Sequence, residues 1–246
     1  SCYNNDHQGV KLMVETGATR TTRLNTPSSS GTLTASGNML SGVSFRALNG
    51  GPTVGNILMS GPNEFNDNLA YGVDIDGVDI ASMIAGLSGS AMNNGMDGVS
   101  ILLDTVAAGT VAINGDGGTV SGNIGDGISV TVTDTTLTSA PSGSTILGPM
   151  TIDGITIDDN RGHGLVVVGT TSDMTSSRIS EVVSTNNDED GILVMLTDTM
   201  ADSLQIVRNE GSGNMFNGIN VELLRTPIDN LHIDDNGTLS GGAINV

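Results

Sequence analysis

A carboxylate or a histidine stands directly before a glycine at several places in this sequence. The residue in that position is Asp97, Asp126, His163, Asp190 and, last, Asn217. Carboxylate oxygens are the ligands that calcium prefers, and a histidine between carboxylates can form charge-assisted hydrogen bonds with them. If these positions stack on one another, Asp97 and Asp126 repel each other unless one of them takes up a proton or a cation bridges them.

The candidate metal ligands are therefore Asp97, Asp126 and Asp190, and calcium is the ion that this set of donors would hold. A second arrangement has Asp126 and Asp190 on either side of His163, each in a charge-assisted hydrogen bond with it. The plainer alternative is that all of these residues are solvent-exposed turn residues. The choice depends on whether the chain folds so that these positions meet.

These positions belong to a repeat that runs through the chain. In each copy an asparagine lies four residues before a glycine that is followed by Val, Ile or Leu, and successive copies are 26 to 37 residues apart. The eight pairs are Asn5/Gly9, Asn38/Gly42, Asn68/Gly72, Asn94/Gly98, Asn123/Gly127, Asn160/Gly164, Asn187/Gly191 and Asn214/Gly218. A ninth, degenerate copy runs from Asn236 through the sequence SGGAINV. Repetition at such a period is typical of solenoids and related arrays.

Aliphatic residues alternate with other residues after each glycine. A period of two indicates a β-strand with one buried face, and no copy contains a convincing amphipathic helix. The residues that we expect to point inward are Val99, Ile101, Ile128, Val130, Leu165, Val167, Ile192, Val194, Ile219 and Val221. A single unit cannot bury such a row, whereas units stacked in parallel about 4.8 Å apart can.

The repeat therefore predicts an all-β fold: a parallel β-helix, or β-solenoid, of about eight to nine coils with little or no helix, in a single domain over residues 1–246. In such a stack the asparagines can form a ladder, and we expect glycine to supply a corner conformation that other residues reach only with strain. A β-sandwich has no reason to repeat one motif at one place in every unit, and a propeller blade is longer than these units.

The composition excludes several classes of function. The chain has 27 acidic and 8 basic residues and a net charge of −19, which argues against nucleic-acid binding because a phosphate-binding groove needs clustered Lys and Arg. No apolar run reaches the roughly 18 residues of a membrane span. Cys2 is the only cysteine, so one chain can form neither a disulfide framework nor a cysteine-based zinc site. The first residue is Ser1, as in a mature secreted chain or an excised fragment, and we expect an extracellular or cell-surface location.

Three phrases carry a resemblance to a known group of proteins: IDDNRGHGLVVV, STNNDEDGILVML and SGNIGDGISVTV. With these phrases the chain resembles the right-handed parallel β-helix repeat proteins, the pectate-lyase-like superfamily in its broad sense. More narrowly, it is similar to the Asn/Gly-rich repeat regions of large bacterial surface proteins. The resemblance implies a parallel β-helix, but the superfamily contains lyases, hydrolases, tailspikes, adhesins and filament subunits, so the fold does not choose among these functions.

The resemblance leaves an enzymatic alternative open, namely a calcium-dependent polysaccharide lyase or a glycoside hydrolase on a β-helix. In that case acids such as Asp158 and Asp159 would act with a basic residue, and Arg161, Arg178 and Arg208 are the nearest in sequence. Sugar-binding clefts usually offer aromatic platforms, yet the chain has no Trp, two Tyr and three Phe, and its acids lie where turns are expected. We therefore assign no catalytic residue and expect a structural protein, with carbohydrate as the other partner class considered.

We expect the chain to associate with copies of itself head to tail. Both ends of the sequence look cut through a coil, and an exposed strand edge pairs readily with another. The strand at residues 9–14 would then pair with the strand at 242–246 of a neighbour, with Cys2, Ile244 and Val246 near that junction. This expectation makes the chain a subunit of a filament or stalk, or a segment of an adhesin.

A lateral contact is a further expectation. Alternation places Val166, Val168, Leu193 and Met195 on the outer face of two adjacent copies, where other copies have polar residues. A contiguous apolar cluster on an otherwise acidic surface usually marks a contact. The alternative is that the long interval between Gly127 and Gly164 folds back over the cluster through its own apolar residues, which are Ile146, Leu147 and Met150.

Overall fold

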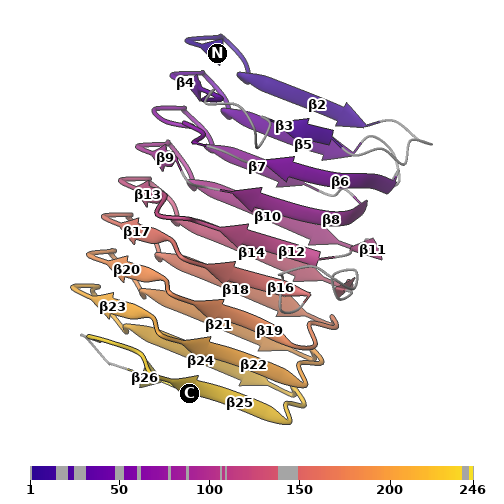
Figure 1. The fold of residues 1–246 in the computed structure, drawn as a ribbon, viewed down its shortest axis with the longest axis vertical. Helices are drawn as coiled ribbons and strands as arrows, with labels where there is room; N and C mark the ends of the chain where they lie inside the picture. Colours follow the sequence, from indigo (N-terminus) through magenta and orange to yellow (C-terminus); the bar gives the residue numbers. More distant parts are fainter. Residues whose placement is uncertain are drawn as a thin grey trace.

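The computed structural model is an all-β parallel β-solenoid, in which the strands stack as successive rungs from the N-terminal to the C-terminal end (Figure 1). The structure describes residues 2–14, 22–24, 32–47, 53–59, 62–76, 79–86, 89–105, 107–108, 110–137, 149–239 and 244–245. These residues contain no helix, and thus none that could cross a membrane. The predicted fold class is confirmed.

Three parallel sheets form the sides of the solenoid. The largest has nine strands, one after each repeat glycine: β2 (Val10–Val14), β5 (Val43–Ala47), β7 (Val73–Asp76), β10 (Val99–Asp104), β14 (Ile128–Thr133), β18 (Leu165–Thr170), β21 (Ile192–Thr197), β24 (Ile219–Leu224) and β26 (Ile244–Asn245). The second has eight strands: β3 (Thr22–Leu24), β6 (Thr53–Met59), β8 (Asp79–Gly86), β12 (Thr110–Asn114), β16 (Met150–Asp153), β19 (Ser177–Ser180), β22 (Ser203–Val207) and β25 (Asn230–Asp234).

The third sheet has five short strands, which lie just before the ladder asparagines: β9 (Ser90–Met92), β13 (Thr119–Ser121), β17 (Thr156–Asp158), β20 (Val183–Thr185) and β23 (Glu210–Ser212). Two further pairs are β1 (Cys2–Tyr3) with β4 (Ala35–Ser36) and β11 (Ala107–Ala108) with β15 (Thr136–Leu137). The solenoid has about six turns, five of which have a strand in the third sheet.

The core is a set of aliphatic columns that run along the solenoid axis. Ile128 pairs with Leu165, Leu165 with Ile192, and Ile192 with Ile219, so these four residues form one column as predicted. All ten residues that we expected to point inward are buried. Because each turn covers the apolar row of its neighbour, no turn needs a helix or a second layer to complete its core.

The repeat asparagines form the predicted ladder. From Asn5 to Asn187 the side chain of each one donates from Nδ2 to Oδ1 of the next, as Asn94 does to Asn123 at 2.9 Å and Asn123 to Asn160 at 2.8 Å. The same Oδ1 atom also accepts the backbone N–H of the preceding asparagine, as in Asn94 N to Asn123 Oδ1 at 2.9 Å. The ladder fixes the corner between the five-stranded and the nine-stranded sheet. The prediction that Asn236 begins a ninth copy was wrong in its position, because Asn236 accepts from Asn209 at 3.1 Å and lies outside this ladder.

The repeat glycine is required for lack of space and not for the corner backbone conformation that we expected. None of the eight repeat glycines has a positive φ; in this part of each turn the left-handed residue is the one before the ladder asparagine, such as Asn93 or Asp159. The glycine is required because its neighbours are too close. A Cβ on Gly127 would lie 2.6 Å from the carbonyl oxygen of Gly164 and 3.0 Å from Nδ2 of Asn160.

Candidate functional site

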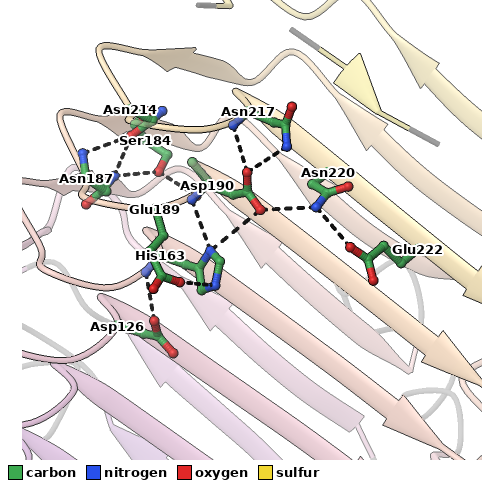
Figure 2. Close-up of polar contacts among 11 residues, drawn as sticks. Asp126, His163, Ser184, Asn187, Glu189, Asp190, Asn214, Asn217, Asn220 and Glu222 are labelled. Atoms are coloured by element: carbon green, nitrogen blue, oxygen red, sulfur yellow. Dashed lines mark hydrogen bonds and ion pairs between the residues drawn. The ribbon is translucent and has the colours of Figure 1, made fainter. Parts of the chain in front are cut away.

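The residues before the repeat glycines form a polar column beside the ladder (Figure 2). Asp97 Oδ1 accepts the backbone N–H of Asp126 at 2.9 Å, and Asp126 Oδ1 accepts the backbone N–H of His163 at 2.8 Å. The backbone N–H of Asp190 donates to Nδ1 of His163 at 3.0 Å. Each of these side chains thus binds the backbone of the turn that follows it, so the predicted stacking of these positions is observed.

His163 has a different carboxylate partner from the two that we expected. Its Nε2 lies 2.5 Å from Oε2 of Glu189, while Oδ2 of Asp190 is 3.8 Å from Nδ1 and Asp126 bonds only to the backbone (Figure 2). Because Nδ1 accepts a hydrogen bond from Asp190 N, the ring proton is assigned to Nε2, where it faces Glu189. The prediction that Asp126 and Asp190 flank the ring was wrong in its partners, although the three residues do lie in one column.

Asp190 is buried and is the most heavily bonded carboxylate of the column. Its Oδ1 accepts the backbone N–H of Asn217 at 2.7 Å and Nδ2 of the same residue at 2.9 Å, and its Oδ2 accepts Nδ2 of Asn220 at 3.1 Å. Asn220 also donates to Oε1 of Glu222 at 3.2 Å (Figure 2). Sequence reasoning did not assign Asn220 and Glu189 to this column. The signal was their position close to it, Asn220 two residues after the repeat glycine and Glu189 directly before Asp190.

Burial changes the acidity of the first two carboxylates. Desolvation raises the pKa of Asp97 to about 6, against the opposing effect of the hydrogen bond from Asp126. Desolvation also raises the pKa of Asp126, against the hydrogen bond from His163. Among the described residues, no three His, Cys, Asp or Glu side chains converge as metal ligands. A cation at Asp97, Asp126 and Asp190 stays a prediction, and each of these carboxylates has a backbone donor in its place.

Replacing Asp97 with asparagine tests the column. The raised pKa means that the ionised form of Asp97 destabilises the fold, so the wild type should gain stability as the pH falls from about 7 toward 4. The amide of the variant would keep an oxygen for the N–H of Asp126 without the buried charge. Asp97→Asn should therefore raise the free energy of unfolding at pH 7.5 by about 1–2 kcal/mol, in urea titrations, and the two proteins should converge near pH 4.

The same variant distinguishes protonation of Asp97 from a cation bound between Asp97 and Asp126. The exposed Asp202→Asn is the control for the loss of one negative charge. If calcium bridges Asp97 and Asp126, the wild type should melt at a higher temperature in calcium, and Asp97→Asn should lose that rise and be less stable than the wild type. That outcome would contradict the protonation account.

Of the three basic residues of the enzymatic alternative, Arg178 and Arg208 line the same concavity, whereas Arg161 lies apart from them. Arg161 is exposed at the ladder corner, and Arg208 donates to Oε1 of Glu181 from Nε at 3.0 Å and from an Nη atom at 2.7 Å. Arg178 donates from Nε to Oγ of Ser180 at 3.0 Å, and Ser180 in turn donates to Asp153 at 2.5 Å. Arg178 lines an open polar concavity of about 470 Å³ over β19, β22 and β25, together with Ser203, Gln205, Val207, Arg208, Asn230, His232 and Asp235.

The predicted lateral patch is only partly at the surface. Val166 pairs with Leu193 and Val168 with Met195, so the four side chains do lie together. Val166 and Leu193 are each only 6% exposed, however, Val168 is half-buried, and Met195 alone is exposed, at 37%. Alternation gives the side of the sheet on which a side chain lies but not its exposure, and the position two residues after the repeat glycine is also buried at Ser44, Asp74 and Asn220.

The other predicted contact residues are placed as follows. Cys2 is a free, half-buried thiol in β1, where it pairs with Ala35 and packs against the core. Ile244 pairs with Ile219 in the nine-stranded sheet, and Val246 lies outside the described residues. Met150 belongs to the core and does not cover the lateral patch, while Ile146 and Leu147 also lie outside the described residues.

A larger exposed apolar surface lies along the ladder corner, and sequence reasoning missed it. Its residues come one or two positions after the ladder asparagines, and we call them the corner ridge: Met39, Leu40, Leu69, Met96 and Ile124, which are 53%, 40%, 65%, 43% and 55% exposed. The signal was available in the register of the repeat, because these residues occupy the same two positions in four consecutive copies.

The chain matches no known protein family, and no curated protein or solved structure is significantly similar to it. The structure shows the fold that the resemblance implies, a parallel β-solenoid, with an asparagine ladder.

Proposed function

We propose that this chain is a structural β-solenoid of a secreted or cell-surface protein, which stacks head to tail as a subunit of a filament or stalk or serves as a segment of an adhesin. The repeat resembles the Asn/Gly-rich regions of large bacterial surface proteins, and that finer likeness is part of the proposal. The bonds that hold the solenoid together are the same from turn to turn, so the fold can be extended by adding turns in register.

The observation that carries the proposal is the state of the apolar rows at the two ends of the described stack. Leu231 and Ile233 of β25 are only partly buried, whereas Leu204 and Ile206, which pair with them one turn earlier, are 1% and 0% exposed. Val10 of β2 is likewise only partly buried at the opposite end. A further turn in register would cover these side chains as each inner turn covers its neighbour.

Ion pairs between successive turns of the chain add to the bonds that hold the solenoid together. Arg208 pairs with Glu181 and Arg225 with Asp198, and each pair joins residues 27 positions apart on neighbouring turns. The Arg225 guanidinium lowers the pKa of Asp198 through its hydrogen bond. The strongly acidic surface keeps a stacked assembly soluble.

Charged substitutions on β25 test the stacking. The double variant Leu231→Lys/Ile233→Lys places charges in the partly buried row and should convert a concentration-dependent assembly into monomers. His232→Lys is the matched control, because it lies on the same strand with its side chain exposed. Sedimentation velocity and negative-stain microscopy measure the outcome, with circular dichroism to confirm that the β-fold remains. A wild-type chain that stays monomeric at high concentration would reject head-to-tail stacking.

A further inference from the structure

The corner ridge follows one straight edge of the solenoid. The residue after each ladder asparagine donates its backbone N–H to the carbonyl oxygen of the ladder asparagine in the preceding copy. This column reads Asp6, Met39, Leu69, Gly95, Ile124 and Arg161 in order, with hydrogen bonds of 2.8, 2.9, 2.8, 3.0 and 3.0 Å from Met39 onward. The next position along each turn reads His7, Leu40, Ala70, Met96, Gly125 and Gly162.

The ridge is bounded by opposite charges. Asp6 and Arg161 are both exposed and occupy the same position of the repeat at the two ends of the apolar stretch. Between them lie four turns without a charged residue in either column. The protein carries a net charge of −19, so a second copy meets less repulsion at an uncharged stretch of this kind than at an acidic face.

We infer that two copies of the chain pair side by side along the corner ridge, antiparallel and related by a two-fold axis between the turns of Leu69 and Gly95. Under this symmetry, each position faces the one at the same distance on the other side of the axis. Leu69 of one copy then faces Gly95 of the other, and Met39 faces Ile124. In the second column Leu40 faces Gly125, and Met96 faces Ala70.

Large side chains therefore face small ones along most of the ridge. The glycine positions are kept free of side chains by the fold itself, because a Cβ on Gly95 would collide with the carbonyl of Leu69 and one on Gly125 with the carboxylate of Asp97. At Gly95 and Gly125 the ridge therefore has no side chain that would exclude one from a partner. Complementary size at a contact of this kind favours one register of the two chains over its shifted alternatives.

The charges select the antiparallel arrangement. The two-fold axis brings Asp6 of each copy opposite Arg161 of the other, so both ends of the contact carry opposite charges. It also brings Tyr71 opposite Asp97, a donor opposite an acceptor. In a parallel two-fold arrangement each turn would face the same turn of the other copy, so the Asp6 side chains of the two copies would lie near each other, as would the two Arg161 side chains.

The contact covers only a short length of the solenoid, and this limits its binding strength. The four apolar turns span three steps of about 4.8 Å, or roughly 14 Å, well below the extent of a standard protein interface. A single pair should therefore be weak, whereas chains held in stacks or on a surface would pair at many ridges at once. The ridge lies along the side of the solenoid, so this pairing is independent of head-to-tail stacking.

The test is made in the Leu231→Lys/Ile233→Lys background, so that stacking does not contribute. Leu69→Asp should raise the dimer dissociation constant at least about tenfold, because it opposes a charge to the apolar ridge twice in each dimer. Met215→Asp is the matched control: Met215 is 69% exposed at the same repeat position but outside the ridge, and its replacement should change the constant less than about twofold. Sedimentation equilibrium up to about 1 mM measures both.

A charge exchange tests the orientation. Arg161→Glu should weaken the dimer about three- to tenfold, because it faces Asp6 in both halves, and adding Asp6→Arg should restore the dissociation constant to within about twofold. No dimer at about 1 mM, or an equal effect of Met215→Asp and Leu69→Asp, would overturn the pairing. Failure of Asp6→Arg to rescue Arg161→Glu would overturn the antiparallel register. Circular dichroism confirms that each variant is folded.

Discussion

Asn123→Ala should lower the free energy of unfolding by about 3–5 kcal/mol, because it leaves several buried polar groups without partners. Asn123 is fully buried in the middle of the ladder. Its Oδ1 accepts both the backbone N–H and Nδ2 of Asn94 at 2.9 Å, and its Nδ2 donates to Oδ1 of Asn160 at 2.8 Å and to the carbonyl oxygen of Ala91 at 3.1 Å. Alanine can replace none of these bonds.

The effect is large because losing a buried hydrogen-bond partner costs more than making the bond gains. A satisfied buried hydrogen bond contributes only about 1 kcal/mol, but each buried group that loses its partner costs about 1–3 kcal/mol in desolvation. The groups that lose a partner here include the backbone N–H of Asn94, its side-chain amide, and the carbonyl of Ala91. Because the ladder is continuous, the defect also weakens the coupling between the turns on either side.

Urea titration of wild type and variant at one pH measures the effect. Asn230→Ala is the control, since Asn230 is exposed on β25, and its replacement should change the free energy of unfolding by less than about 0.5 kcal/mol. Equal effects of the two substitutions would show that the ladder accompanies the fold without stabilising it.

The sequence predicts the fold through repetition. One alternating pair of aliphatic residues is weak evidence for any fold. When the same motif recurs along the whole chain, few folds can bury every copy equally. The column from Ile128 to Ile219 follows from that constraint alone, since strands of equal phase can pair in parallel only in register. The asparagine ladder follows for the same reason.

The polar site was less predictable because its partners depend on side-chain rotamers. Stacking of Asp126, His163 and Asp190 followed from the repeat, but the ring of His163 turns toward Glu189, a residue one position away from the column. The role of the repeat glycine was also hidden, because its need for space depends on the carbonyl of the next turn. The sequence repeat predicts where each residue lies along the solenoid axis, but it does not predict which side chains touch one another.

Ile192→Ala should lower the free energy of unfolding by about 2–5 kcal/mol, because it opens a cavity that the stack cannot close. Ile192 is fully buried between Leu165 and Ile219 in the column. Its neighbours are held at the strand spacing by backbone hydrogen bonds on both sides, such as Ile192 N to Gly218 O at 3.0 Å and Leu165 N to Gly191 O at 2.9 Å. The turns therefore cannot move together to fill the space.

Two further variants separate packing from strand propensity. Ile192→Val keeps a β-branched side chain and removes one methyl group, so it should cost about 0.5–1.5 kcal/mol. Met195→Ala removes a side chain of similar size from the outward face of the same strand, where it is 37% exposed, and should cost less than about 1 kcal/mol. Equilibrium unfolding in urea gives all three values. Should Ile192→Ala cost no more than Met195→Ala, the aliphatic column would not be the source of stability, and the polar ladder would have to hold the turns together.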